Sequence, residues 1–210
     1  MKQIEVQIDK TTHCVEEKNH YKTQLAKTQI VIATSLRKNG HHITRLKHKE
    51  FGKTKKWNTF TVTREGVIYQ HYDDKYHTDF LGVKQGDKQS ISIVLENMGC
   101  LFLSPSGKYI NWLNEVCEDE NVVEKKWLGY NYWEKFDDEQ LESTVLLCRK
   151  MCEKHNIPLK SIDFHHYHKD TMKFKGIVFR SNYIEDSSDI NPLFDIKKFN
   201  KMLGQNIVIK

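Results

Sequence analysis

No stretch of this 210-residue sequence stays apolar over the roughly 20 residues that a membrane span requires. The first residues, MKQIEVQIDKTTHC, also lack the apolar centre of a secretory signal peptide. Both absences argue against a membrane partner and against secretion through a signal peptide. We therefore expect the chain to be made and kept in a cytoplasm, and to leave it by lysis or within a particle.

Disulfide spacing and the common nucleotide and serine-hydrolase motifs are missing as well. The five cysteines are odd in number and none are spaced as CxxC, so reduced thiols are expected. The sequence contains no GxSxG, GxGxxG or GxxxxGK[ST], so neither a serine nucleophile nor nucleotide binding has a local sign. It also has no internal repeat, and its length suits one domain with small additions.

Charge of one sign is not concentrated enough to favour nucleic-acid binding. The formal net charge is +5, and basic and acidic residues are interleaved. The densest basic run, RLKHKEFGKTKKW at 45–57, is interpreted as a solvated helix–loop face. Contact of this run with phosphates is the alternative, and it predicts a steep dependence of affinity on salt.

The hydrophobic pattern predicts a mixed sheet with helices on its faces, which is an α/β fold. Strands are expected at 29–35 and 89–99, and a hairpin at 57–72 turns at Gly66. Helices are expected at 39–51, at 137–157 with a capping box of Asp137 and Gln140, and from Pro192 to residue 203. The division proposed is an N-terminal extension at 1–27, a domain at 28–203 with an aromatic-rich loop inserted at 104–135, and a tail at 204–210.

Metal-ligating side chains gather late in the chain. The candidates are His165, His166, His168 and Asp189, with the pair His41-His42 earlier. Catalytic zinc takes about three ligands of these types and keeps a position for water, whose pKa the metal lowers. The alternative is that these histidines are polar surface residues of a loop.

Several segments in their order resemble one enzyme family. These are TQIVIATS, WNTFTVTREGVIYQ, YHTDFLG, QSISIVLENMG, FDDEQLES and DFHH followed by SDINPLFDIKKF, which together span roughly residues 28–203. They are similar to the N-acetylmuramoyl-L-alanine amidases of the peptidoglycan-recognition and bacteriophage-lysozyme type, and most similar to a divergent branch from phages. The resemblance implies a single α/β domain with a central mixed sheet. It also implies zinc-dependent hydrolysis of the amide between N-acetylmuramic acid and L-alanine in peptidoglycan.

The resemblance carries over onto three residues. DINPLFD matches the family's DPGPxFD, which makes Asp189 the third zinc ligand. DFHH stands where the family has GH, which makes His165 the second ligand and His166 its substitute. Glu96 is the carboxylate left in the central strand and is the candidate catalytic base, because the neighbouring family position reads Val94.

The first ligand position departs from the family. The strand end that should carry a histidine reads Ala33-Thr34, and alanine cannot bind zinc. His42, or His41, is the candidate replacement from the first helix. If neither reaches, the domain is a degenerate amidase that serves as a phage structural component or as a glycan- or protein-binding module.

Substrate contacts are expected from three further positions. His77 in YHTDFLG stands where family members place a groove histidine, and Asn58 replaces the aromatic residue of the hairpin's aromatic–histidine pair. Trp133 belongs to an aromatic stretch suited to stacking on sugars, unless these rings anchor a core. Arg180 is expected to pair with Asp186 or Asp189. Peptidoglycan is thus the expected partner, with a virion protein as an alternative partner.

Overall fold

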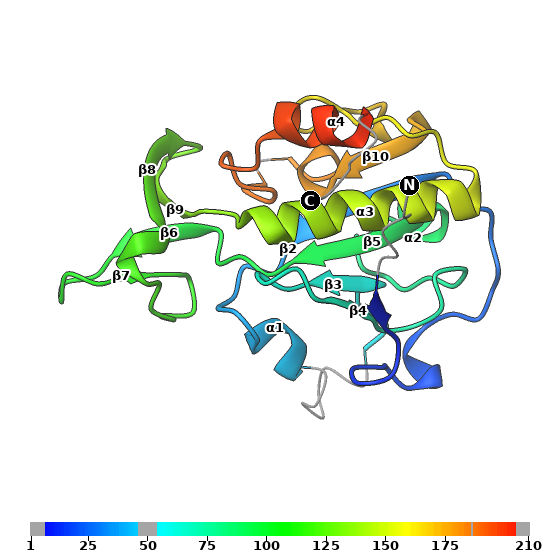
Figure 1. The fold of residues 1–210 in the computed structure, drawn as a ribbon, viewed down its shortest axis with the longest axis horizontal. Coiled ribbons are helices and arrows are strands. Elements are labelled where there is room, and N and C mark those ends of the chain that lie inside the picture. The colour runs from blue at the N-terminus through cyan, green and yellow to red at the C-terminus, as the bar shows by residue number, and fades with distance from the viewer. Residues whose placement is uncertain (1–6, 46–53, 186, 205–210) are drawn as a thin grey trace, which may run out of the picture.

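The computed structural model describes residues 7–45, 54–185 and 187–204. A six-stranded mixed sheet forms the centre, in the order β1-β4-β3-β5-β2-β10 (Figure 1). Only β3 and β4 pair antiparallel in this sheet, and the other neighbours run parallel. Its strands are β1 (Ile8–Asp9), β2 (Gln29–Thr34), β3 (Phe60–Val62), β4 (Ile68–Gln70), β5 (Ser90–Leu95) and β10 (Gly176–Phe179). The predicted α/β class, the two strands and the hairpin are confirmed.

One face of the sheet packs against the long helix α3 (Asp138–His155) and against α4 (Ile196–Gly204). The pairing of Ile30 with Ile91 places the alternate residues of β2 and β5 on this face, where they meet Val145 and Cys148. The helix predicted at 137–157 is therefore confirmed. Its capping box is not formed, because the Gln140 amide donates instead to the carbonyl oxygens of Val62 and Glu96.

The opposite face is covered by loops and short helices. A smaller apolar cluster joins Val31 and Val178 to Leu81 and Ile162. The short helices of the domain are α1 (His41–Thr44), α2 (Lys84–Gln89) and the 3-10 turns Glu17–Asn19, Thr171–Lys173 and Arg180–Asn182. None of the helices in the described ranges has the length and apolar character needed to cross a membrane.

The segment predicted as an aromatic-rich loop is a second, antiparallel sheet, so that prediction is wrong. It contains β6 (Cys100–Leu103), β7 (Tyr109–Ile110), β8 (Val122–Trp127) and β9 (Tyr130–Glu134), with a 3-10 turn at Asp119–Asn121, and it projects beside the central sheet (Figure 1). Leu128 and Gly129 connect β8 to β9 with φ values of 48° and 79°. Positive φ at both positions suits a tight hairpin, but Leu-Gly lacks the usual asparagine or aspartate signal.

Other boundaries differ from the predictions. The last helix begins at Ile196 rather than near Pro192, and the Asp195 carboxylate accepts the backbone N–H of Lys198. Ser161 forms one isolated bridge with Ile177, and α2 has no sequence counterpart among the predicted helices. Residues 46–53 of the predicted 39–51 helix and of the basic run, and 205–210 of the tail, lie outside the described ranges. Within the predicted N-terminal extension at 1–27, β1 pairs with β4 and so belongs to the central sheet. The predicted division into an extension, a domain and a tail stays a prediction.

Candidate functional site

The carboxyl ends of the parallel strands bring several predicted site residues to one edge of the sheet. Thr34 ends β2, Glu96 follows β5, and Arg180 follows β10. Because β2 lies between β5 and β10, the loops that leave these strands are neighbours. Clefts at this edge are where ligands of open α/β sheets bind.

Asp189 is buried and links two of these strand ends. Its Oδ1 accepts the backbone N–H of Thr34 at 2.6 Å and the Thr34 hydroxyl at 2.8 Å. Its Oδ2 lies 3.6 Å from Nη1 of Arg180, which confirms Asp189 as a partner of Arg180; Asp186, the other predicted partner, lies outside the described ranges. Burial raises the pKa of the Asp189 carboxyl, while Arg180 and Thr34 oppose this shift by favouring the charged form.

His165 lines a pocket of about 270 Å³ together with Trp127, Ser181 and Ser187. Its ring lies 6.0 Å from the ring of Trp127 and 6.2 Å from that of Phe179. Its Nδ1 is buried and has no hydrogen-bond partner in the described part of the chain. Burial lowers the pKa of His165, so its neutral imidazole is the favoured form at this pocket.

His42 is held in a different cluster. Its ring stacks on Trp57 at 4.8 Å, and its Nε2 lies 3.0 Å from Oδ1 of Asn58. Asn58 in turn donates to the Thr61 hydroxyl at 2.9 Å, which lies 2.7 Å from Nε2 of His71. His42 and Asn58, predicted as a metal ligand and a substrate contact, are therefore partners of each other and buried.

Acid is expected to destabilise the protein through these two histidines. Burial lowers the pKa of His42 to about 4 and that of His71 to about 3, from 6.5. Their contribution to the free energy of unfolding is complete above pH 6.5 and is lost as the pH falls towards 4. For His42 the loss is roughly 3 kcal/mol. Urea unfolding at about pH 7 and about pH 5 measures this loss. His42→Gln should make the free energy of unfolding depend less steeply on pH, whereas the same change at exposed His168 should leave the dependence unchanged. Equal slopes for wild type and His42→Gln would contradict the role given to His42.

Glu96 is fully buried beside the loop after β2. Its Oε1 accepts the backbone N–H of Gly40 at 2.9 Å, and its Oε2 has no partner among the residues described. Burial raises the pKa of Glu96 to about 7, with smaller contributions from Glu65 and Glu134. A carboxyl group with this pKa exchanges its proton near neutrality, as a general base must. Its role in catalysis stays a prediction.

The donor atoms at this edge do not fit a zinc site. Ala33 offers no ligand, one oxygen of Asp189 is taken by Thr34, and the other faces the Arg180 cation. Among the predicted ligands in the described ranges, His165 Nδ1, Asp189 Oδ2 and His42 Nδ1 have no hydrogen-bond partner, but His42 lies in the separate cluster with Trp57 and Asn58. Two predicted ligand atoms therefore remain at this edge, one of them facing Arg180, whereas zinc in enzymes is held by about three protein ligands. Across the described ranges, no three His, Cys, Asp or Glu side chains group in a way that would hold a metal.

The two remaining predicted substrate contacts lie elsewhere. His77 stacks on Tyr21 at 4.9 Å and lines a pocket of about 490 Å³ with Leu25 and Lys88, at the amino ends of β2 and β5. Trp133 has no exposed surface, and its indole N–H donates to the Lys125 carbonyl at 2.7 Å. The geometry gives neither residue a contact with the His165 pocket, and their roles stay predictions. The sequence placed Thr34 at the strand end of the first ligand position, but it gave no sign that Thr34 would donate two hydrogen bonds to Asp189.

The family model for N-acetylmuramoyl-L-alanine amidase matches residues 13–175, which is most of the chain. The chain belongs to the N-acetylmuramoyl-L-alanine amidase family. Peptidoglycan amide hydrolysis is the activity that this membership supports. The match includes Ala33, Glu96 and His165 but ends before Asp189, so the assignment of Asp189 as a ligand still rests on the short motif alone.

Solved structures share the amidase fold at low sequence identity. The N-acetylmuramoyl-L-alanine amidase LysC from Clostridium intestinale URNW is 12% identical, with 94% of this chain and 97% of that chain covered and a TM-score of 0.55. A mutant endolysin from Bacillus subtilis is 15% identical, with 95% and 100% covered and a TM-score of 0.58. The catalytic domain of XlyA is 16% identical, with the same coverage and a TM-score of 0.57. No curated protein matches the chain.

Proposed function

We propose that this chain hydrolyses the amide bond between the lactyl group of N-acetylmuramic acid and L-alanine in peptidoglycan. The observation that carries the proposal is the family match across 13–175, joined to a pocket at the carboxyl edge of the sheet. A pocket of about 270 Å³ suits a fragment of a peptide-bearing sugar rather than a large ligand. That the chain reaches the cell wall by lysis or in a virion stays a prediction.

The residues at this edge can bind and orient an amide. The open Nδ1 of neutral His165 can accept a hydrogen bond or donate one, according to its tautomer. The Arg180 guanidinium, partly exposed, supplies positive charge close by. Glu96, with a pKa of about 7, is the candidate proton acceptor, and a shift of the loop after β2 is needed to expose it. Zinc remains an expectation from the family, and no step is assigned to it because the donor set does not fit.

His165→Ala is expected to lower kcat/KM by about 100-fold or more, because it removes a neutral imidazole that lines the pocket. The assay incubates soluble muramoyl peptides with the chain and measures newly exposed alanine amino groups. Parallel arms use protein as purified, protein treated with chelator and protein supplied with zinc. Lys169→Ala, on the exposed part of the same loop, is the matched control. Release that is unchanged by His165→Ala would remove the pocket from the mechanism.

Binding without cleavage is a second candidate, and one observation favours it. Thr34 occupies one carboxylate oxygen of Asp189, and the other oxygen faces the Arg180 cation, whose charge opposes a metal ion at this position. Sedimentation with purified cell-wall sacculi separates the two functions. If the protein sediments with the sacculi but releases no alanine amino groups, whether as purified, treated with chelator or supplied with zinc, a binding module is supported and hydrolysis is contradicted.

A further inference from the structure

Trp112 is the most exposed of the large hydrophobic side chains in the described ranges, at 58%. It lies in the small sheet's loop between β7 and β8. Its indole N–H donates to the carbonyl oxygen of Leu36 at 2.9 Å, and the Asn111 amide donates to the same oxygen at 3.3 Å. Leu36 is two residues beyond Thr34, so the indole is fixed beside the edge of the sheet that carries the proposed site.

The surroundings of Trp112 are polar and well ordered. Glu115 accepts hydrogen bonds from the backbone N–H of Lys38 at 2.8 Å and from Asn111 at 2.6 Å, and it lies 2.5 Å from Nδ1 of His41. The Arg37 guanidinium lies over one face of the Trp112 ring, 5.7 Å from its centre, which leaves the other face for a ligand, and its Nε is buried without a partner in the described part of the chain. A fixed aromatic face thus adjoins hydrogen-bonding groups, one of which is unsatisfied.

We propose that Trp112 is the stacking platform of a saccharide subsite that holds the glycan strand of peptidoglycan at the loop after β2, on the edge of the sheet where the parallel strands end. Sugar rings present an apolar face and polar edges, which match an indole face flanked by Arg37 and Asn111. Because Trp112 is already held by Leu36, stacking costs little side-chain entropy. The identity of the glycan rests on the proposed function, whereas the stacking itself does not.

The test measures binding of a short N-acetylglucosamine oligomer, which carries no peptide and so reports independently of hydrolysis. Trp57 and Trp133 are buried, so iodide quenches mainly Trp112 and the partly exposed Trp127. The oligomer should protect the wild-type chain from quenching. Trp112→Phe should abolish that protection, because only Trp112 reports the stacked face.

Affinity for the oligomer, measured by calorimetry, separates stacking from loop anchoring. Trp112→Ala should weaken binding about tenfold, whereas Trp112→Phe, which keeps a ring but loses the bond to Leu36, should stay within about threefold. Leu159→Ala, at a residue 48% exposed in the loop after α3, is the control and should bind as the wild type does. Equal losses in the Ala and Phe variants would assign Trp112 to loop anchoring and overturn the proposal. Absence of oligomer binding by the wild type, or attachment to another protein through this loop instead, would overturn it as well.

Discussion

Asp189→Ala is expected to lower the free energy of unfolding by about 4 kcal/mol, whether or not zinc or a chelator is present. The carboxylate is buried, and it holds the end of β2 through Thr34 and the turn after β10 through Arg180. Its removal leaves the Thr34 N–H and hydroxyl without an acceptor and the Arg180 cation without its counter-charge. Urea unfolding in excess chelator and in excess zinc measures the effect.

Two further variants separate the hydrogen bonds of Asp189 from its charge and from a general effect of removing a carboxylate. Asp189→Asn keeps an oxygen for Thr34 and loses only the charge facing Arg180, so it should cost about 1–2 kcal/mol. Asp163→Ala, at an exposed carboxylate, should change stability by less than about 0.5 kcal/mol. A zinc ligand would behave differently, because zinc would stabilise the wild type and neither Asp189 variant. Near-stoichiometric zinc in the purified wild-type protein, lost in Asp189→Asn, would contradict the bridging role.

The central sheet could be predicted because its strands are buried on both faces or alternate regularly. QIVIATS is a short apolar run that a covered strand accommodates, QSISIVLENMG alternates with Ile91, Ile93 and Leu95 on one face, and Gly66 marks the hairpin turn with a φ of 80°. The small sheet was missed because VVEKKW and YNYWE mix charged and aromatic residues, and their turn has no typical signal. Trp133 of this sheet is fully buried and packs against Trp127 and Tyr130, and local pattern does not reveal that burial.

The candidate site could be predicted only in part. The Arg180–Asp189 pair followed from the chemistry of the two side chains, and the structure confirms it. The position of His42 could not be predicted from the sequence, because a residue eight positions after β2 is equally compatible with either face of the sheet. Its ring is instead held by Trp57 and Asn58, which a spacing argument does not reveal. Spacing in the sequence identified residues that come together because parallel strands end at the same edge of the sheet. It did not identify residues whose position is set by a loop.

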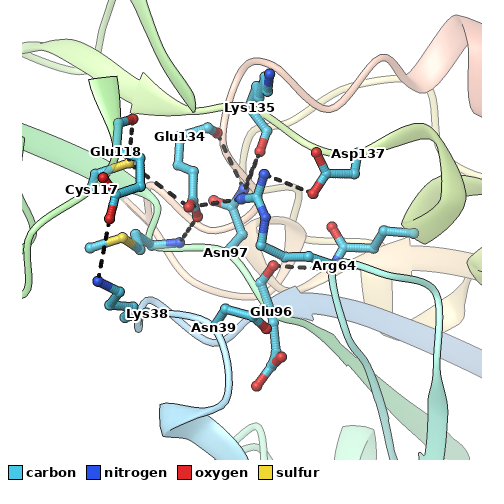
Figure 2. Close-up of polar contacts among 12 residues, drawn as sticks. Lys38, Asn39, Arg64, Glu96, Asn97, Cys117, Glu118, Glu134, Lys135 and Asp137 are labelled. Carbon is cyan, nitrogen blue, oxygen red and sulfur yellow. Dashed lines mark hydrogen bonds and ion pairs between the residues drawn. The ribbon is translucent and has the colours of Figure 1, made fainter. Parts of the chain in front are cut away.

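Arg64 joins the two sheets, and its replacement should have the second large effect. Its guanidinium lies 2.7 Å from the Glu134 carboxylate and 2.7 Å from that of Asp137 (Figure 2). Glu134 also accepts the backbone N–H of Met98 at 2.5 Å, and its burial raises the pKa of its carboxyl while Arg64 opposes the rise. Arg64→Ala is therefore expected to cost about 3–5 kcal/mol, because a buried carboxylate loses its counter-charge.

The dependence of this loss on pH identifies Glu134 as its cause. Without Arg64, the folded-state pKa of Glu134 rises further above its unfolded value, so protonation favours the folded form. The stability difference between wild type and Arg64→Ala should shrink as the pH falls from about 7 towards about 5, and titration of His42 cancels in that difference. Arg64→Met combined with Glu134→Gln should recover more than half of the loss, since no unpaired charge remains buried. A loss that stays constant with pH and persists in the double variant would instead assign the role of Arg64 to packing between the two sheets.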